Sequence, residues 1–238
     1  MRFRSIISAI IIASITLISC ADNANISEGA TRSEALFERG QYYFEQGKYS
    51  KAIETLTEFV YSYPYNARIA EGTFLLAETY FAGEQFDLAA NEYRRVAERY
   101  TESEYAEPAE LKMAESLLEA SPRVELDQSR TEEALEAFRS FVTYHPTSEY
   151  LPRAREGIRQ CRDKLAEVEY RAAELYLKLE QPESVILYAD LIAEEYSDTR
   201  WVPEALLLEG IAREEQLEEP DKAREIYSRI VQEYPESE

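Results

Sequence analysis

The chain has 238 residues, of which 45% are hydrophobic, and its 47 acidic and 26 basic side chains give a formal net charge of −21. The hydrophobic share is sufficient for a buried core, and a scarcity of glycine (7 residues) beside abundant Ala, Leu, Glu and Arg favours helices. The acidity argues against binding to nucleic acid or anionic lipid, which needs clustered cations, and we interpret it as a solvated surface or, alternatively, one for a basic partner.

The first twenty residues have the pattern of a bacterial export signal. Two arginines precede an almost unbroken apolar stretch over residues 6–18, as in the n- and h-regions of a secretory signal. The stretch is too short for a membrane span, which needs about 20 apolar residues. It ends in "LISC", which resembles the lipobox, where a cysteine after a small residue is acylated. We therefore predict a lipoprotein signal peptide over residues 1–19 and covalent lipid, including palmitate, on Cys20.

Lipidation of Cys20 predicts where the protein resides. A single acyl chain anchors a protein weakly, whereas several chains hold it on a membrane almost permanently. In bacterial lipoproteins, aspartate directly after the cysteine often retains the protein in the inner membrane, and here that position is Ala21. We expect a protein on the outer membrane that faces the periplasm, with residues 20–31 as a lipidated flexible tether. Cys161 then has no disulfide partner, and we expect a packed thiol in a helix.

An internal repeat organises the remaining chain. Five segments can be superimposed without gaps, and each has a small side chain at the same position: Ala52, Ala89, Ala134, Val185 and Ala223. Twelve residues later a proline or a hydroxyl residue follows: Pro64, Thr101, Pro146, Ser197 and Pro235. In four of the repeats, the residue twelve positions before this small side chain belongs to a preceding helix, at the point where the two helices are expected to cross. These residues are Gly40, Ala77, Ala173 and Ile211. This is the tetratricopeptide pattern, in which small residues let paired helices approach closely and proline ends the second helix.

The repeats predict an all-α fold, a right-handed superhelix of five helix pairs with about ten helices. Residues 150–179 contain no helix-stopping signal, so we expect one unusually long helix, or two nearly collinear ones, between repeats 3 and 4. A loop is expected over residues 121–130. The predicted organisation is therefore repeats 1–3 over residues 32–147 and the long helix with repeats 4–5 over residues 148–238.

Local signals predict several helix starts. Capping-box spacing, with a hydroxyl residue three positions before a glutamate, places helix starts at Thr31, Thr101 and Ser129. Pro182 and Pro220 fit the first turn of a helix, where the missing N–H costs nothing.

The residue types needed for catalysis do not form a recognisable constellation. His145, the one histidine, stands at an expected helix end, where we predict a C-terminal cap. A glycine-rich phosphate loop and a Cys/His metal cluster are both missing from the sequence. Acidic pairs such as Glu194-Glu195 and Glu214-Glu215 are interpreted as solvated helix faces rather than as a general acid and base. We expect no enzyme, no catalytic or metal-ligating residue, and no cofactor besides the lipid on Cys20.

Four of the 18 tyrosines fall outside the repeat pattern, near turns or on first-helix faces: Tyr42, Tyr61, Tyr65 and Tyr105. Exposed aromatic side chains that line a concave superhelix would suit an extended peptide with its own aromatic residues. We predict these four as a candidate peptide groove, with satellite packing or simple exposure as the alternative.

The lipobox, the short tether and five repeats with a long helix after the third together resemble the BamD family, lipoproteins of the machinery that inserts β-barrels into the bacterial outer membrane. The resemblance covers almost the whole chain after Cys20. It is most specific over "RDKLAEVEYRAAELY" (residues 162–176), and "ALEAFRSFVTYHPTSEY" (134–150) and "SDTRWVPEALL" (197–207) support it. The strong acidity departs from the family's pattern.

The resemblance implies a non-catalytic scaffold that assists folding and insertion of outer-membrane proteins. The later repeats would dock a POTRA domain of a BamA-like barrel protein. The early repeats would receive the C-terminal segments of unfolded outer-membrane proteins, which end in an aromatic residue. Other assembly lipoproteins would be further partners, and nucleic acid is not expected. The alternative is another repeat-bearing envelope lipoprotein, one that coordinates cell-wall, pilus or secretin assembly.

Overall fold

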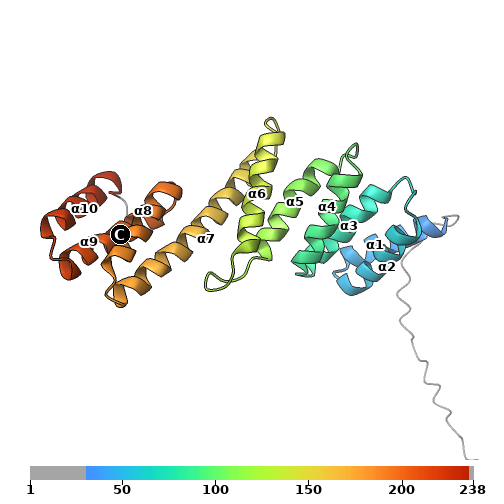
Figure 1. Ribbon diagram of the computed structural model, residues 1–238. Helices are drawn as coiled ribbons and strands as arrows, with labels where there is room; N and C mark the ends of the chain where they lie inside the picture. The colour runs from blue at the N-terminus through green and yellow to red at the C-terminus, as the bar shows by residue number, and fades with distance from the viewer. Residues whose placement is uncertain (1–30, 236–238) are drawn as a thin grey trace, which may run out of the picture.

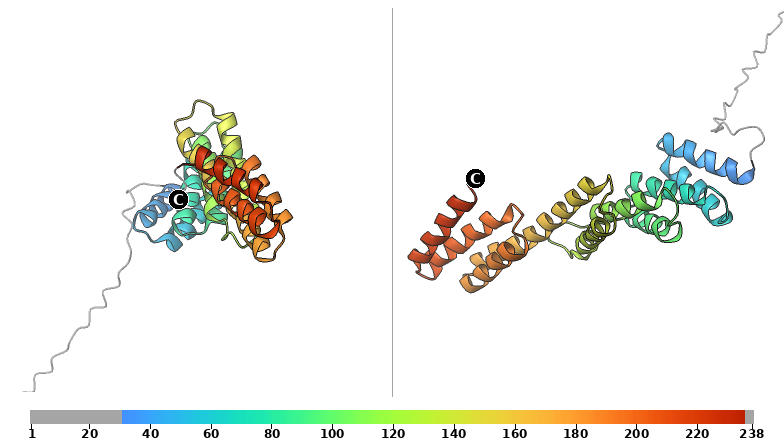
Figure 2. Two further views of the ribbon diagram at one scale, coloured as in Figure 1. Left: turned by 90° about the vertical axis from the view of Figure 1, so that its left-hand side faces the viewer. Right: turned by 90° about the horizontal axis from the view of Figure 1, so that it is seen from above.

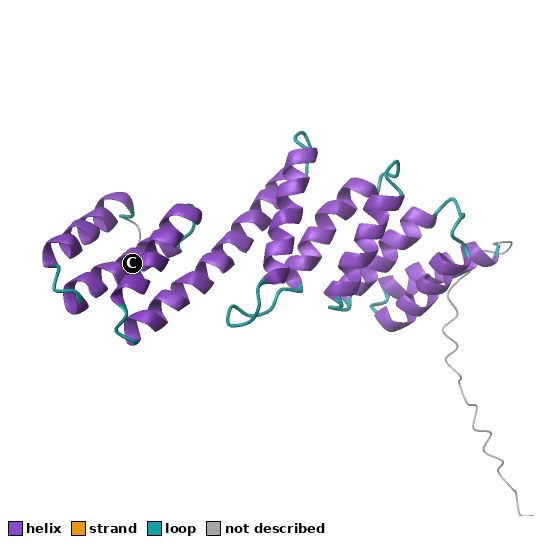
Figure 3. Ribbon diagram, viewed as in Figure 1, coloured by secondary structure: helices purple, strands orange, loops and turns teal. Residues whose placement is uncertain are grey.

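The computed structural model describes residues 31–235, which form ten α-helices and no strand (Figures 1 and 3). In chain order they are α1 (Arg32–Glu45), α2 (Tyr49–Ser62), α3 (Ile69–Ala82), α4 (Phe86–Arg99), α5 (Ala106–Glu119), α6 (Ser129–Tyr144), α7 (Leu151–Lys178), α8 (Pro182–Glu195), α9 (Trp201–Ile211) and α10 (Pro220–Glu233). Consecutive helices pair and stack into an elongated array with α1 and α10 near opposite ends (Figure 2). The predicted all-α repeat fold is confirmed. The predicted signal peptide, Cys20 and almost all of the predicted tether lie outside the described residues.

Small residues sit where the helices cross, as the repeat pattern predicts. A Cβ atom on Gly40 would lie 2.6 Å from the side chain of Leu56, and one on Gly72 would lie 2.3 Å from the ring of Phe59. Backbones therefore approach more closely at these positions than any side chain would permit. The small positions of the second helices are fully buried: Ala52, Ala89, Ala134, Val185 and Ala223.

The fifth repeat contains a local irregularity that the sequence pattern does not reveal. After Ile211 the helix continues as a π-helical turn over Ala212–Gln216, which accommodates an extra residue relative to the other repeats. The residue that packs against Tyr227 is therefore Gly210, where a Cβ would lie 2.2 Å from the ring. Ile211 was predicted to lie at the helix crossing of the fifth repeat, and this is wrong by one residue. A comparison of the repeats without gaps cannot detect a single inserted residue.

The long helix α7 joins the two groups of repeats. It is one continuous helix of 28 residues with Pro152 in its first turn, as predicted. Its first half packs against α5 and α6, where Gly157 and Cys161 are buried, and its second half packs against α8 and α9 around Ala173. Cys161 is a free cysteine that is fully buried, which confirms the packed thiol. This burial raises the pKa of the thiol to about 12.

The loop between α5 and α6 lies along the middle of α7. Lys164 of α7 donates hydrogen bonds to the carbonyl oxygen (3.3 Å) and the hydroxyl (2.5 Å) of Ser121. About two turns further along α7, Arg171 lies 3.3 Å from Glu125 of the same loop. The loop therefore braces α7 near the point where the two groups of repeats meet. The prediction of a loop at residues 121–130 is confirmed, except that α6 already begins at Ser129.

The predicted helix starts are confirmed in part. Thr31 forms the expected capping box with Glu34, and Pro182 and Pro220 begin α8 and α10. Thr101 is wrong because the chain makes two further turns before α5 begins at Ala106. The helix start at Ser129 is confirmed, since Ser129 is the first residue of α6, but the N-cap is its neighbour Gln128 and the expected capping box does not form. The Gln128 side chain instead ties the preceding loop, donating to two loop carbonyls at 2.9 Å each.

Candidate functional site

The first helices of repeats 1–3 and the start of α7 line a cavity of about 460 Å³. Its walls are mixed aromatic, apolar and charged side chains: Phe37, Gln41, Phe44, Glu45, Glu71, Phe74, Leu75, Glu78, Tyr105, Pro108, Leu111, Lys112, Tyr150 and Arg153. The volume is within the roughly 300–1,000 Å³ that is typical of ligand sites. One face of the early repeats is therefore hollowed, and its lining combines aromatic and charged side chains.

A second cavity of about 400 Å³ continues from the first, and Arg153 lines both. Its lining comes from α3, α5, α6 and α7: Phe81, Glu115, Leu118, Glu119, Phe138, Pro152, Arg153, Glu156, Gly157 and Gln160. We call the two cavities together the groove. It runs from α1 across α3 and α5 to the first half of α7.

Packing fixes the aromatic rings of the groove in place. The ring of Phe74 lies 5.3 Å from that of Tyr105 and 5.4 Å from that of Tyr93, measured between centroids. Phe37 is held edge-on against Phe59, and the guanidinium of Arg68 stacks 3.6 Å from its centroid. Such contacts between rings, and between cations and rings, orient side chains as well as burying them. The rings of the apolar wall are therefore each held against a neighbouring side chain.

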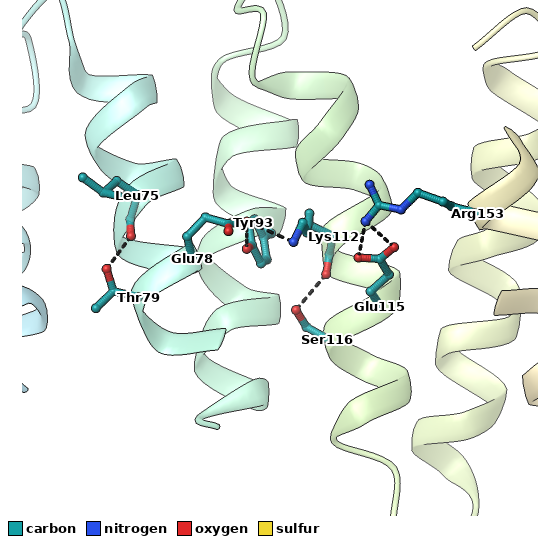
Figure 4. A network of polar contacts seen from close by, with 8 residues as sticks. All are labelled: Leu75, Glu78, Thr79, Tyr93, Lys112, Glu115, Ser116 and Arg153. Carbon is teal, nitrogen blue, oxygen red and sulfur yellow. Dashed lines mark hydrogen bonds and ion pairs between the residues drawn. The ribbon is translucent and has the colours of Figure 1, made fainter. Parts of the chain in front are cut away.

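A row of charged side chains runs from α3 across α5 to α7 among the residues that line the two cavities (Figure 4). Glu78 of α3 accepts a hydrogen bond from the Tyr93 hydroxyl and lies 3.3 Å from the ammonium of Lys112 of α5. Burial, and next the Glu78 carboxylate, raise the pKa of Tyr93, so the phenol stays protonated and donates. On the other side of Lys112, Arg153 of α7 contacts Glu115 of α5 at 2.7 Å. Both cations of the groove are therefore already paired with carboxylates.

The structure does not bring the four predicted tyrosines together. Tyr105 lines the groove beside Phe74. Tyr42 lies on α1 beside Tyr43, with ring centroids 5.8 Å apart, and does not line the groove. Tyr61, 64% exposed, is on the second helix α2 with the Arg95 guanidinium 5.0 Å from its ring, and Tyr65 is 99% exposed in the following turn. Peptide binding by these side chains stays a prediction, and only Tyr105 contributes to the groove.

Sequence reasoning missed the aromatic residues that do line the groove, although a signal for them exists. Phe37 and Phe44 stand three positions before and four positions after Gly40, the small residue of α1. Phe74 and Phe81 have the same offsets from Ala77 of α3. All four belong to the groove. Residues at these offsets share one face of a first helix, because they are separated by seven residues, about two turns.

The histidine and the glutamate pairs considered as candidate catalytic residues have structural roles. His145 is the C-cap residue of α6, as predicted, and its Nε2 lies 2.8 Å from a carboxylate oxygen of Glu110. The glutamates at positions 194–195 and 214–215 are exposed, as solvated helix faces require. Within residues 31–235, no group of three or more His, Cys, Asp or Glu side chains is placed to hold a metal ion. The same residues contain no helix that is long and apolar enough to cross a membrane.

Comparison with known proteins gives a family match and two relatives. The family model of YfiO, described as an outer membrane lipoprotein, matches residues 29–228. A protein of Caulobacter vibrioides described as outer membrane protein assembly factor BamD is 28% identical over 173 residues, 73% of this chain and 57% of the relative. A Rickettsia prowazekii protein with the same description is 23% identical over 206 residues, 87% of this chain and 82% of the relative. The match therefore spans little more than half the length of the Caulobacter protein.

Among solved structures, the chain is similar to helical-repeat proteins. A Podosopora anserina putative kinesin light chain with TPR-like repeats has a TM-score of 0.39 and 15% identity, over 86% of this chain and 95% of the other. A Rap protein in complex with competence and sporulation factor has a TM-score of 0.39 and 18% identity, over 87% of this chain and 55% of the other. Neither likeness bears on what this chain binds.

Proposed function

The chain belongs to the YfiO family of outer membrane lipoproteins, and from this we propose that it is a non-catalytic scaffold in the assembly of outer-membrane β-barrel proteins. The observation that carries the proposal is the extent of the family match. Residues 29–228 include nine complete helices and most of α10, so both groups of repeats and the long helix between them are covered. The two relatives described as BamD assembly factors support the same role.

The proposed anchor is lipid on Cys20, after removal of residues 1–19. Multiple acylation would hold the protein at the periplasmic face of the outer membrane. Residues 20–31 would then tether the first helix near that surface. Confinement to one surface raises the effective concentration of a scaffold for partners on the same membrane, so weak contacts suffice.

The proposed substrate site is the groove. An unfolded outer-membrane protein would lay its C-terminal segment along the first helices and insert an aromatic side chain against Phe37, Phe74 and Tyr105. These rings are held by packing, so binding would not have to order them first. Aromatic side chains bury large areas and make favourable ring contacts, which makes them suitable anchors for a weakly structured chain.

The proposed partner site is the C-terminal half, which would dock a POTRA domain of a BamA-like barrel protein. This half presents large apolar side chains to solvent, among them Leu175 of α7, Leu187 of α8 and Leu207 of α9, which are 54%, 65% and 42% exposed. Exposed apolar side chains of this size are common in protein interfaces. These side chains lie in the second half of α7 and beyond it, whereas the groove ends in the first half of α7, so substrate and partner would bind at the same time. Other assembly lipoproteins are further proposed partners.

Depletion of the protein, followed by a profile of outer-membrane proteins, tests the proposal. Specific loss of barrel proteins from the outer membrane is the expected result. Unchanged barrel proteins with an altered cell wall, pili or secretins would instead favour the alternative, another envelope lipoprotein with the same repeats.

A further inference from the structure

We infer that the groove selects segments in which an aromatic residue is flanked by lysine or arginine, rather than segments held by a free terminal carboxylate. The inference rests on the proposed function, since it takes the groove to be a site for unfolded polypeptide. It adds a charge preference to the aromatic preference proposed above, and it places the bound aromatic residue within the segment instead of at its last position.

The charge of the lining is the first observation. Six glutamates line the groove, three in each cavity, against only two cationic side chains, Lys112 and Arg153: Glu45, Glu71, Glu78, Glu115, Glu119 and Glu156. A concave surface lined by charges of one sign focuses the field and attracts ligands of opposite sign. Four of the six are already paired with cations: Glu71 with Arg68, Glu156 with Arg159, Glu78 with Lys112 and Glu115 with Arg153. Glu45 and Glu119 therefore carry the excess negative charge of the lining, which favours a cationic segment over an acidic one.

The pairing of the two cations is the second observation. Lys112 lies 3.3 Å from Glu78, and the Arg153–Glu115 contact is 2.7 Å. The side chains of Lys112, Glu78 and Glu115 are only 23%, 26% and 23% exposed. A ligand carboxylate at Lys112 would have to displace Glu78, which would then lose its partner in a partly desolvated position. At Arg153, which is 50% exposed and already neutralised by Glu115, a further ion pair is screened by solvent. A free C-terminus therefore gains little from either cation.

The placement of the remaining acids is the third observation. Glu45 is an exposed residue near the α1 end of the groove, beside Phe44, and Glu119 is an exposed residue of the second cavity, beside Leu118. The aromatic wall of Phe37, Phe74 and Tyr105 belongs to the first cavity. A chain laid along the groove with its aromatic residue at this wall has carboxylates available on both sides of it.

Peptide binding to the full-length protein in detergent tests the inference. The probes are short fluorescein-labelled peptides of Ser, Thr and Gly that carry one phenylalanine flanked by lysines or by glutamates. Each is made with a C-terminal amide and with a free acid, and one lysine peptide has Ala in place of Phe. We expect the lysine peptide to bind about tenfold more tightly than the glutamate peptide, and the free acid to change affinity by less than about twofold. The preference shrinks as salt rises from about 0.05 to about 0.5 M.

Charge-neutral variants locate the effect. The double variant Glu45→Gln and Glu119→Gln keeps side-chain shape at two exposed sites and is expected to lower the preference for lysine about threefold. The matched control is Glu54→Gln with Glu98→Gln, two exposed glutamates on the second helices α2 and α4, and it should change nothing.

The outcomes separate this inference from the proposed function. Equal binding of lysine and glutamate peptides, a strong gain from the free acid, or an unchanged preference in the groove variant would overturn the inference and leave the groove as an aromatic site. If no phenylalanine peptide binds, or the Ala peptide binds as well as its Phe counterpart, the groove is not the proposed site and both ideas fail.

Discussion

Arg153 of α7 places one guanidinium nitrogen 2.7 and 2.9 Å from the two carboxylate oxygens of Glu115 of α5. The two residues are 38 positions apart in the chain, and both lie where the cavities of the groove meet. The pair therefore joins the long helix to the third repeat and neutralises one carboxylate of the groove at the same time. Replacing Arg153 by an uncharged residue should show how much the pair contributes to stability and how much it changes the charge of the groove.

Arg153→Met keeps an unbranched apolar stem and removes the guanidinium with its charge. The Arg153 side chain is 50% exposed, so we expect the free energy of unfolding to fall by no more than about 1 kcal/mol. The uncovered Glu115 should raise the affinity for lysine-flanked peptides about threefold. Denaturant unfolding and fluorescence anisotropy measure the two effects. Arg224→Met on α10, which breaks the exposed pair with Asp221, is the control and should leave peptide affinity unchanged. A loss of affinity in Arg153→Met would show that the arginine itself binds the peptide.

Gly157→Ala tests the close approach of α7 to α6. Alanine improves helix propensity by about 1 kcal/mol, but its Cβ would lie 2.3 Å from the ring of Phe138. Overpacking of a tight core costs about 1–3 kcal/mol, so we expect net destabilisation in denaturant unfolding followed by circular dichroism. Phe138→Leu in the same chain should recover part of the loss, because the ring is what the methyl group meets. Two additive losses would contradict this explanation.

The turns between paired helices contain residues with left-handed backbone conformation. Gly47 has φ of 67° in the first repeat, whereas glutamate occupies the corresponding conformation in later turns: Glu84, Glu180 and Glu218, with φ of 56°, 55° and 56°. A non-glycine residue in this conformation costs about 1–2 kcal/mol, partly offset by the greater freedom of glycine in the unfolded chain. Each Glu→Gly substitution should therefore stabilise by about 0.5–1 kcal/mol, seen as a higher denaturation midpoint. Gly47→Ala should do the reverse. A lower midpoint for the glycine variants would mean that the glutamates make stabilising contacts.

The repeats were predictable because close helix crossings tolerate few residue types, and positions such as Ala52 and Ala134 repeat that constraint. The π-helical turn at Ala212–Gln216 was not predictable from the sequence, since a single inserted residue leaves the hydrophobic pattern nearly unchanged. In the groove, Phe37 and Phe74 follow a readable offset from the small residues. The pairing of Arg153 with Glu115 depends on how two repeats pack, so no local pattern indicates it.

The pH dependence of stability should report the contact between α7 and the turn after α8. Arg162 donates hydrogen bonds to Asp198 (2.8 Å from Nε) and to the carbonyl oxygen of Glu195 (2.8 Å). The hydrogen bond from Arg162 holds the pKa of Asp198 below its ordinary value. A depressed pKa in the folded state gives stability that is present above the unfolded value of about 3.8 and is lost as pH falls through the folded value.

Asp198→Asn should therefore destabilise the protein at neutral pH and make no difference at strongly acidic pH. Because the Asp198 side chain is 49% exposed, solvent screening limits the expected loss to about 0.5–1 kcal/mol. Urea unfolding of both proteins across the acidic range measures the difference. A gap between them that stays constant with pH would assign the loss to packing or hydrogen bonding rather than to ionisation.

Charged substitutions in the C-terminal half test the proposed division between partner and substrate sites. Leu175→Glu and Leu207→Glu place charges on exposed positions of α7 and α9, so the fold should tolerate them. If these side chains are buried against a POTRA domain, an unpaired carboxylate in the interface should weaken binding about tenfold or more. Co-purification with a barrel protein that bears POTRA domains should then fail while peptide binding in the groove persists. Leu88→Glu, at a 45% exposed position of α4, is the matched control and should leave both interactions intact. Normal co-purification of both C-terminal variants would place the partner elsewhere on the array.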